Sequence, residues 1–170
     1  MELPPIPLRQ HDGVSCGPSV AIVAGALLDP GYRSELSTAG WFAAEQGQVH
    51  RAMRRIWPRF LGMTPTAMAR AISGHSGGMR YRWRLVRRHD RLLDVREAVL
   101  LGWPVPMLVG RFIPRHWVLL VGVAGTQAFQ CYEPSSGEVR TVAADAIRVA
   151  RLTGVGFPRP VAFVLPARGR

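Results

Sequence analysis

The 170-residue chain contains no lysine, only two cysteines and no long apolar run. Two cysteines without a C-x-x-C pair exclude a disulfide scaffold and provide no zinc or thioredoxin motif. No apolar run approaches the ~18 residues that a membrane-spanning helix needs. The proline-rich start, MELPPIPLRQ, has no apolar signal core. We therefore expect no signal peptide and no membrane span, and a protein that stays in the cytoplasm or leaves by a dedicated secretion system.

All 22 basic residues are arginine, and against 11 acidic residues they give a formal net charge of +11. Lysine also neutralises phosphates, so a binding function alone would not exclude it. Abundant alanine, glycine, proline and arginine indicate a GC-rich genome, which accounts for part of the basicity. The charge still creates a field that attracts anions, so an acidic partner is an open alternative.

Helical patterns fill residues 14–78. The chain is long enough for one domain with a sizeable core, and 48% of its residues are hydrophobic. Cys16-Gly17-Pro18 precedes the first apolar stretch, and Asp29-Pro30-Gly31 ends it. Thr64-Pro65 is typical of an N-cap and first helical position, and Gly74 of a helix end. The expected helices cover residues 20–28, 37–57 and 67–73.

Strand patterns fill residues 79–166. Tyr81, Trp83 and Leu85 alternate with arginines, which predicts a strand with one wet face. Further strands are expected over 105–112, 117–123, 126–132 and 161–165, with short helices from Asp90 to residue 101 and over 143–150. Helices followed by antiparallel strands predict an α+β fold, which we expect to form a single domain over residues 1–170.

Cys16 lies at the start of the first expected helix, in the segment QHDGVSCGP. The dipole and free N–H groups of a helix N-terminus stabilise a thiolate. Attack on a carbonyl also needs donors for the developing oxyanion, and the Gln10 side chain and the Cys16 N–H are candidates for that role. Cys16 is therefore a candidate nucleophile, and the alternative is a small buried hydrophobe.

His116 opens one apolar strand and Glu133 closes the next. If Ala124-Gly125 is a two-residue turn without a bulge, His116 lies directly opposite Glu133. A carboxylate there would orient the imidazole and stabilise its protonated form. His116 is the candidate base and Glu133 the candidate orienting group. Either residue alone is an ordinary strand-end or turn residue.

The order of these motifs resembles papain-like cysteine peptidases. The spacing from Gln10 to Cys16-Gly17-Pro18, the His116-Trp117-Val118 strand and the Glu133-Pro134 turn are most similar to the branch that processes bacteriocin leaders after a double glycine. The resemblance implies a helical half packed on an antiparallel sheet. It also implies Cys16 as nucleophile, His116 as base, Glu133 as orienting group and Gln10 as oxyanion donor. The family usually has Asp or Asn where this chain has Glu133.

The expected activity is hydrolysis of peptide bonds through a Cys-His-Glu triad and a thioester, on a protein or peptide substrate. One alternative keeps the site in a bacterial toxin or effector domain that acts as a protease, deamidase or transglutaminase and has an inhibitory or immunity protein. Bacterial growth arrest that Cys16→Ala abolishes would favour it. A second alternative is a catalytically silent, arginine-rich binding module, which would bind its partner unchanged after Cys16→Ala.

Other motifs point to structure rather than chemistry. Gly74-His75-Ser76-Gly77-Gly78 fits the G-x-S-x-G nucleophile elbow, but a helix pattern precedes it where the elbow needs a strand, so we expect a loop. Cys131 is expected in the core, near Glu133. Tyr81 and Trp83 would point away from the neighbouring arginines, which argues against a nucleic-acid stacking surface. The histidines show no metal-ligand spacing, so neither a metal nor another cofactor is expected.

Overall fold

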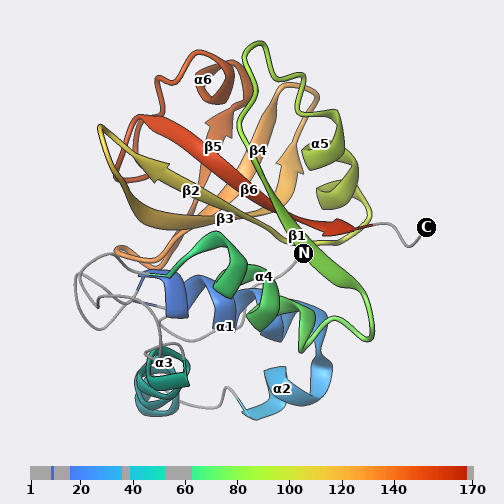
Figure 1. The fold of residues 1–170 in the computed structure, drawn as a ribbon, viewed down its shortest axis with the longest axis vertical. Helices are drawn as coiled ribbons and strands as arrows, with labels where there is room; N and C mark the ends of the chain where they lie inside the picture. Colours follow the sequence, from blue (N-terminus) through green and yellow to red (C-terminus); the bar gives the residue numbers. More distant parts are fainter. Residues whose placement is uncertain (1–8, 10–15, 36–38, 53–62, 168–170) are drawn as a thin grey trace.

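Helices occupy the first half of the chain and strands most of the second half. The computed structural model describes residue 9 and residues 16–35, 39–52 and 63–167. In this part of the chain four helices precede the first strand, and two more lie among the strands (Figure 1). The helices are α1 (Cys16–Leu28), α2 (Pro30–Glu35), α3 (Ala39–Ala52), α4 (Pro65–Ser73), α5 (Leu93–Leu100) and α6 (Ala144–Arg148). The strands are β1 (Arg80–Leu85), β2 (Val105–Gly110), β3 (Pro114–Ala124), β4 (Ala128–Glu133), β5 (Glu138–Ala143) and β6 (Arg159–Ala167).

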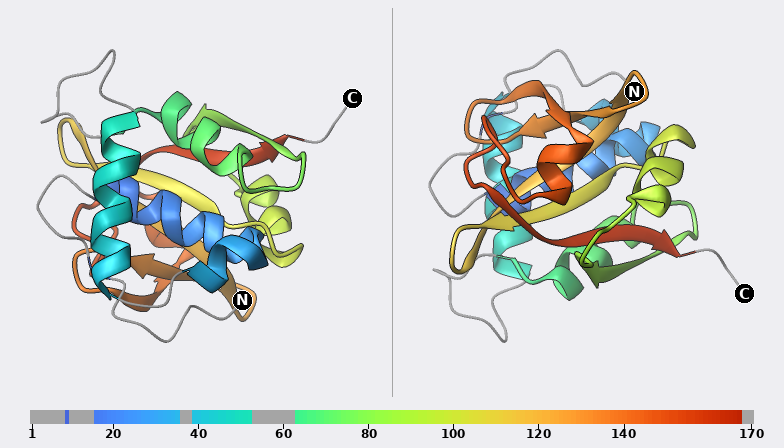
Figure 2. Two further views of the ribbon diagram at one scale, coloured as in Figure 1. Left: turned by 90° about the horizontal axis from the view of Figure 1, so that it is seen from below. Right: turned by 90° about the horizontal axis from the view of Figure 1, so that it is seen from above.

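The strands form one antiparallel sheet in the order β1-β6-β2-β3-β4-β5. Helix α1 packs on β3 and α4 packs on β1, so these helices form a layer on one face of the sheet (Figures 1 and 2). Helix α5 packs on the other face, against β3 and β6, and α6 packs beside β5. Helices packed on an antiparallel sheet make this an α+β fold, with the change from helices to strands between Ser73 and Arg80.

The central strand β3 is buried on both faces. Trp117, Leu119 and Val121 pack in the cluster that α1 and α4 cover. Val118 and Leu120 pack in the opposite cluster, with Val95 of α5, Ile147 of α6 and Phe163 of β6. Successive side chains of a strand point to opposite faces, so a strand between two apolar layers needs an uninterrupted apolar run. This explains why residues 117–121 are apolar without alternation.

The expected helix signals are largely confirmed. The Thr64 hydroxyl accepts a hydrogen bond from the Ala67 N–H at 3.2 Å, Pro65 opens α4 and Gly74 caps its end. The expected helix over 37–57 corresponds to α3, although residues 37–38 and 53–57 lie outside the described residues. Asp29 has a role that the sequence analysis missed. It ends α1 and its carboxylate accepts from the N–H groups of Gly31 and Tyr32, which starts α2.

We expected buried and exposed side chains to alternate along β1, and this prediction is wrong beyond Tyr81. Tyr81 is buried, but Trp83 and Leu85 are exposed because β1 is an edge strand. Arg84 is instead the half-buried residue. Its guanidinium bonds Asp90 and Asp94 at 2.6 Å each and lies 5.1 Å from the centre of the Phe163 ring. Paired in this way, an arginine stem can cover apolar surface.

Several elements among the strands also differ from the expected ones. Asp90 was expected to cap the helix that runs to residue 101, but α5 begins at Leu93 with Leu92 before it; the Asp90 carboxylate instead accepts from the N–H groups of Arg87 and Leu92 and stabilises the preceding turn. Strand β5 was not expected, and its exposed residues obscure its pattern. Strand β4 begins two residues later than expected, at Ala128. No helix in the described ranges is long and apolar enough to cross a membrane.

Candidate active site

Cys16 is the first residue of α1 and is 2% exposed. The next residue has to be small because α1 lies close to its neighbours here. A Cβ on Gly17 would lie 2.6 Å from the Met63 Cβ and 3.4 Å from the Trp117 ring. The Trp117 indole N–H in turn donates to the Met63 carbonyl oxygen at 2.8 Å. These contacts hold the N-terminus of α1 against the start of β3.

His116 and Glu133 meet at the end of the sheet beside α1. The distance between His116 Nε2 and Glu133 Oε1 is 2.9 Å, and the two residues are 6% and 5% exposed. The backbone N–H of Ser135 donates to Glu133 Oε1, and that of Ser136 donates to Oε2, each at 2.9 Å. The turn after β4 therefore holds the carboxylate in place for the imidazole.

The predicted contact between His116 and Glu133 is present, but the predicted register is wrong. The β3–β4 loop has three residues, 125–127, rather than a two-residue Ala124-Gly125 turn. A bulge also lies between Leu120 and Gly122. The last pair of this ladder is Leu119 with Tyr132. Continued one step, this register sets Val118 opposite Glu133, so His116 is a diagonal neighbour of the glutamate.

Electrostatics couple Cys16, His116 and Glu133. Burial lowers the pKa of His116, but hydrogen bonds to the side chains of Cys16 and Glu133 outweigh it and raise that pKa to about 9. Burial likewise raises the pKa of Glu133, whereas the bonds from His116, Ser135 and Ser136 hold it well below its usual value. Because Glu133 occupies Nε2, the other ring nitrogen, Nδ1, is left for Cys16. The arrangement favours the protonated form of the His116 imidazole, beside the Glu133 carboxylate.

Gln10, the predicted oxyanion donor, lies outside the described residues. Its neighbour Arg9 is described. The Arg9 guanidinium donates to the Ser135 carbonyl oxygen at 2.9 Å, and the Arg9 carbonyl oxygen accepts from Gln46 Nε2 at 3.2 Å. The chain immediately before Gln10 is thus held beside the Glu133 turn, which is a place that the sequence alone did not indicate.

The segment before β6 also touches the imidazole, and the sequence analysis missed it. A Cβ on Gly156 would lie 3.1 Å from His116 Cδ2, and Gly156 has a φ of +82°. The Phe157 ring centre lies 6.1 Å from that of His116. The closely spaced glycines Gly154 and Gly156 were the available signal, since a positive φ and a close approach both favour glycine.

The other candidate residues are not part of this site. Cys131 packs in the core on the α5 side of the sheet, and burial raises its pKa. Ser76 lies in the loop that follows α4, and its hydroxyl donates to the carbonyl oxygens of Ser73 and Met79. The expectation of a loop rather than a nucleophile elbow is confirmed. Among the described residues no group of three or more His, Cys, Asp or Glu side chains could hold a metal ion.

Comparison with known proteins identifies the fold. No protein-family model matches the chain, and neither does any curated protein. Among solved structures, the fold is shared with a bacterial peptidase domain. This is the peptidase domain of Streptococcus ComA, described as a bi-functional ABC transporter involved in a quorum-sensing pathway. The match covers 94% of this chain and 96% of that domain, with a TM-score of 0.52 and 15% sequence identity.

Proposed function

We propose that this chain is a papain-like cysteine peptidase in which Cys16, His116 and Glu133 form the catalytic triad. The observation that carries the proposal is the 2.9 Å contact between His116 Nε2 and Glu133 Oε1, together with the influence of the Cys16 side chain, which raises the pKa of the same imidazole. A nucleophile needs a base, and the base needs a group that orients it. The fold shared with a peptidase domain supports the same reaction class.

The reaction would proceed by acyl transfer. The Cys16 thiolate attacks the substrate carbonyl carbon, and the oxyanion is held by the Cys16 N–H and the Gln10 side chain. As the C–N bond breaks, protonated His116 gives its proton to the leaving amine, which leaves a thioester on Cys16. Neutral His116 then takes a proton from water, whose oxygen attacks the thioester; the C–S bond breaks, the acid is released, and the Cys16 thiolate and protonated His116 are restored. Glu133 stays ionised throughout.

The length of the glutamate side chain fits its position. Diagonal neighbours across an antiparallel pair are about 7–8 Å apart, farther than directly opposed residues. Glu133 reaches His116 from such a diagonal place, and a side chain shorter by one methylene would have to close that distance by moving the strands. This diagonal place supports a glutamate at position 133, where the resembling family has Asp or Asn.

Alkylation by iodoacetamide tests the proposal. The reaction is run near pH 6, below the pKa of about 8.5 of an ordinary thiol, and adducts are mapped on Cys16 and Cys131. We expect selective labelling of Cys16 that slows at least about tenfold in His116→Ala. The control is His89→Asn, since His89 is exposed and has a positive φ that asparagine tolerates. Equal, slow labelling of both cysteines in all variants would contradict an activated pair.

A second measurement tests the reaction itself. The full-length chain is incubated with a mixture of peptides, and the products are analysed by mass spectrometry. Peptide cleavage that disappears in Cys16→Ala is the expected result. The contrary result would be that Cys16 is reactive but the peptides are deamidated or cross-linked and not cleaved. It would show that the site is assembled and that its reaction is not hydrolysis of peptide bonds.

A further inference from the structure

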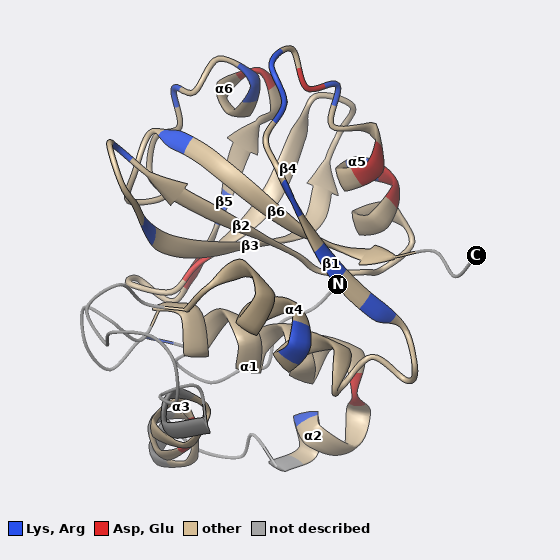
Figure 3. Cartoon of the chain, viewed as in Figure 1, with Lys and Arg blue, Asp and Glu red and all other residues tan. Residues whose placement is uncertain are grey.

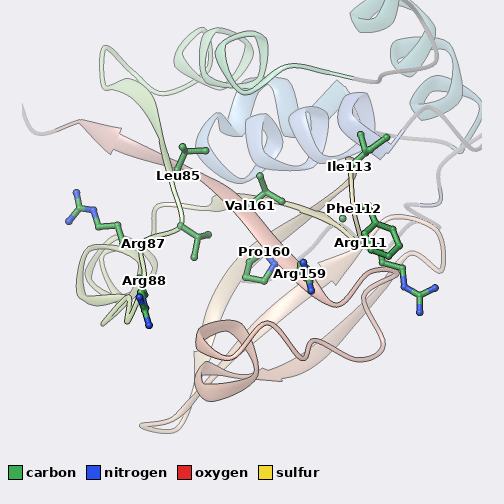
Figure 4. Close-up of a pocket in the computed structure, with 11 residues that line it drawn as sticks. Leu85, Arg87, Arg88, Arg111, Phe112, Ile113, Arg159, Pro160 and Val161 are labelled. Atoms are coloured by element: carbon green, nitrogen blue, oxygen red, sulfur yellow. The ribbon is translucent and has the colours of Figure 1, made fainter.

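A groove runs across the start of β6, where β1 leaves the sheet. One wall is the end of β1 and the turn after it, and the other is the β2–β3 turn (Figure 4). Arg159, Pro160 and Val161 form the floor between them. The groove has a volume of about 380 Å³, and its described lining does not include Cys16, His116 or Glu133.

Four arginines line this groove, and all are exposed. They are Arg87, Arg88, Arg111 and Arg159. The arginine ion pairs found among the described residues involve Arg84, Arg140 and Arg148, and none of the four in the groove. None of the described residues that line the groove is acidic. Most basic segments of the described chain lie on the sheet and its loops rather than on helices α1 to α4 (Figure 3). The groove therefore presents uncompensated positive charge.

The same groove exposes large apolar side chains. Phe112 is 89% exposed, and Leu85 and Ile113 are each 59% exposed. Single exposed apolar residues are common, but here three of them line one groove between arginines. Apolar anchors surrounded by arginines are typical of protein-binding surfaces.

The backbone of β6 is also accessible to a partner at this place. The pairing of β1 with β6 ends at Leu85 and Ala162, and is extended by the bond from the Val86 N–H to the Val161 carbonyl oxygen at 2.9 Å. In the described chain, Arg159 and Pro160 have no strand partner on the β1 side. Pro160 has no N–H, so an added extended segment could pair here only through the backbone of Arg159 and the Pro160 carbonyl oxygen.

We propose that this groove binds an acidic polypeptide segment that carries an apolar anchor residue. Arginine pairs with carboxylates through two parallel hydrogen bonds, which suits the four unpaired guanidinium groups. The lining is largely aliphatic, with one aromatic ring, which suits the side chains of a polypeptide. A site for single-stranded nucleic acid would instead need a series of aromatic rings on which bases stack.

The groove also lies near the candidate active site. Ile113 on one wall is three residues before His116, a separation of roughly 10 Å along a strand. Arg159 on the floor is two residues after Phe157, whose ring faces His116. A bound segment would therefore be held close to the site. Binding itself goes beyond the proposed function, because it uses none of the triad residues.

Fluorescence anisotropy with a labelled peptide tests this inference. The probe is a short glutamate-rich peptide with one leucine and one phenylalanine, and its control has glutamine at every glutamate. The full chain carries Cys16→Ala, so that no cleavage interferes. We expect binding of the acidic probe only, and weaker binding as sodium chloride rises. Arg111→Ala with Arg159→Ala should raise the dissociation constant about tenfold, the effect of losing two exposed ion pairs.

Matched variants separate a site from general attraction. Arg91→Ala with Arg151→Ala removes the same charge from exposed positions outside the groove and should change the dissociation constant less than about twofold. Phe112→Ala should weaken binding without loss of fold, since Phe112 is almost fully exposed. The proposal is overturned if the probe does not bind, if both double variants weaken it equally, or if a single-stranded oligonucleotide displaces it at lower concentration.

Discussion

Glu133 meets His116 diagonally across the β3–β4 ladder, with 2.9 Å between Oε1 and Nε2. Each residue is held by a different neighbouring strand, His116 by its pairing with Val109 of β2 and Glu133 by its pairing with Glu138 of β5. The contact therefore depends on the registers of four strands. It places the Glu133 carboxylate, whose pKa is held well below its usual value, against the imidazole.

Glu133→Gln should lower the pKa of His116 from about 9, because the Glu133 carboxylate is one of the two groups that raise it. The titration of the His116 imidazole, followed by NMR, measures this. Peptidase activity should fall by about 10²- to 10⁴-fold, as expected when the group that orients the base is neutralised. Glu138→Gln, at the exposed start of β5, is the control and should change neither quantity. An unchanged His116 titration would contradict the assigned role.

The free energy of unfolding that the His116–Glu133 pair contributes should fall at both low and high pH. The pKa of Glu133 is lowered from 4.5, so its contribution is complete above about that pH and declines as pH falls below it. The pKa of His116 is raised from 6.5 to about 9, so its contribution is complete below 6.5 and is lost as pH rises through 9. Both contributions are complete between about pH 4.5 and pH 6.5. The difference in melting temperature between wild type and His116→Gln should be largest there and should shrink toward pH 9. A difference that grows with pH would show the opposite sign of linkage.

Gly17→Ala should destabilise the fold and impair the site together. The added methyl group would meet the Met63 Cβ at 2.6 Å, so α1 or the Met63 segment must move. Overpacking of this kind costs about 1–3 kcal/mol of the free energy of unfolding. Urea denaturation measures it, and labelling of Cys16 reports the displacement of the helix N-terminus. Gly74→Ala is the control, because Gly74 has a helical φ and no contact shorter than 3.4 Å, and it should stay within about 0.5 kcal/mol of wild type.

Gln10→Ala tests the proposal that Gln10, which lies outside the described residues, is an oxyanion donor. Loss of one such donor costs about 10²–10³ in kcat with little change in KM, since the interaction forms only in the transition state. Gln48→Ala on α3, where the side chain is exposed, is the control. Steady-state kinetics on any peptide that the protein cleaves measure kcat and KM for both variants. If kcat were unchanged while Cys16→Ala is inactive, the donor would have to be another group.

The hairpin shows why a wrong register still led to the right neighbours. The three-residue loop shifts the pairing by three positions from the one that a two-residue turn predicts, which would put Glu133 on the opposite face of the sheet. The bulge at Val121 takes one position back, so the net shift is two. Side chains repeat every two residues along a strand, so a shift of two keeps the face and moves Glu133 only from a direct to a diagonal place. The turn and the bulge could not be read from Ala124-Gly125 alone.

Local signals in the sequence determined the helix that carries Cys16, the Thr64 cap, the apolar run of β3 and the residue types of the candidate site. These depend on neighbours within a few positions, so they can be read along the chain. Tertiary structure decided what depends on distant segments. It brings Cys16 near His116 and Arg9 beside Ser135. At β1, the side chain that packs over the core is Arg84 rather than Trp83. Tertiary structure also left four arginines around one groove, because the end of β1, the β2–β3 turn and the start of β6 meet only when the sheet forms.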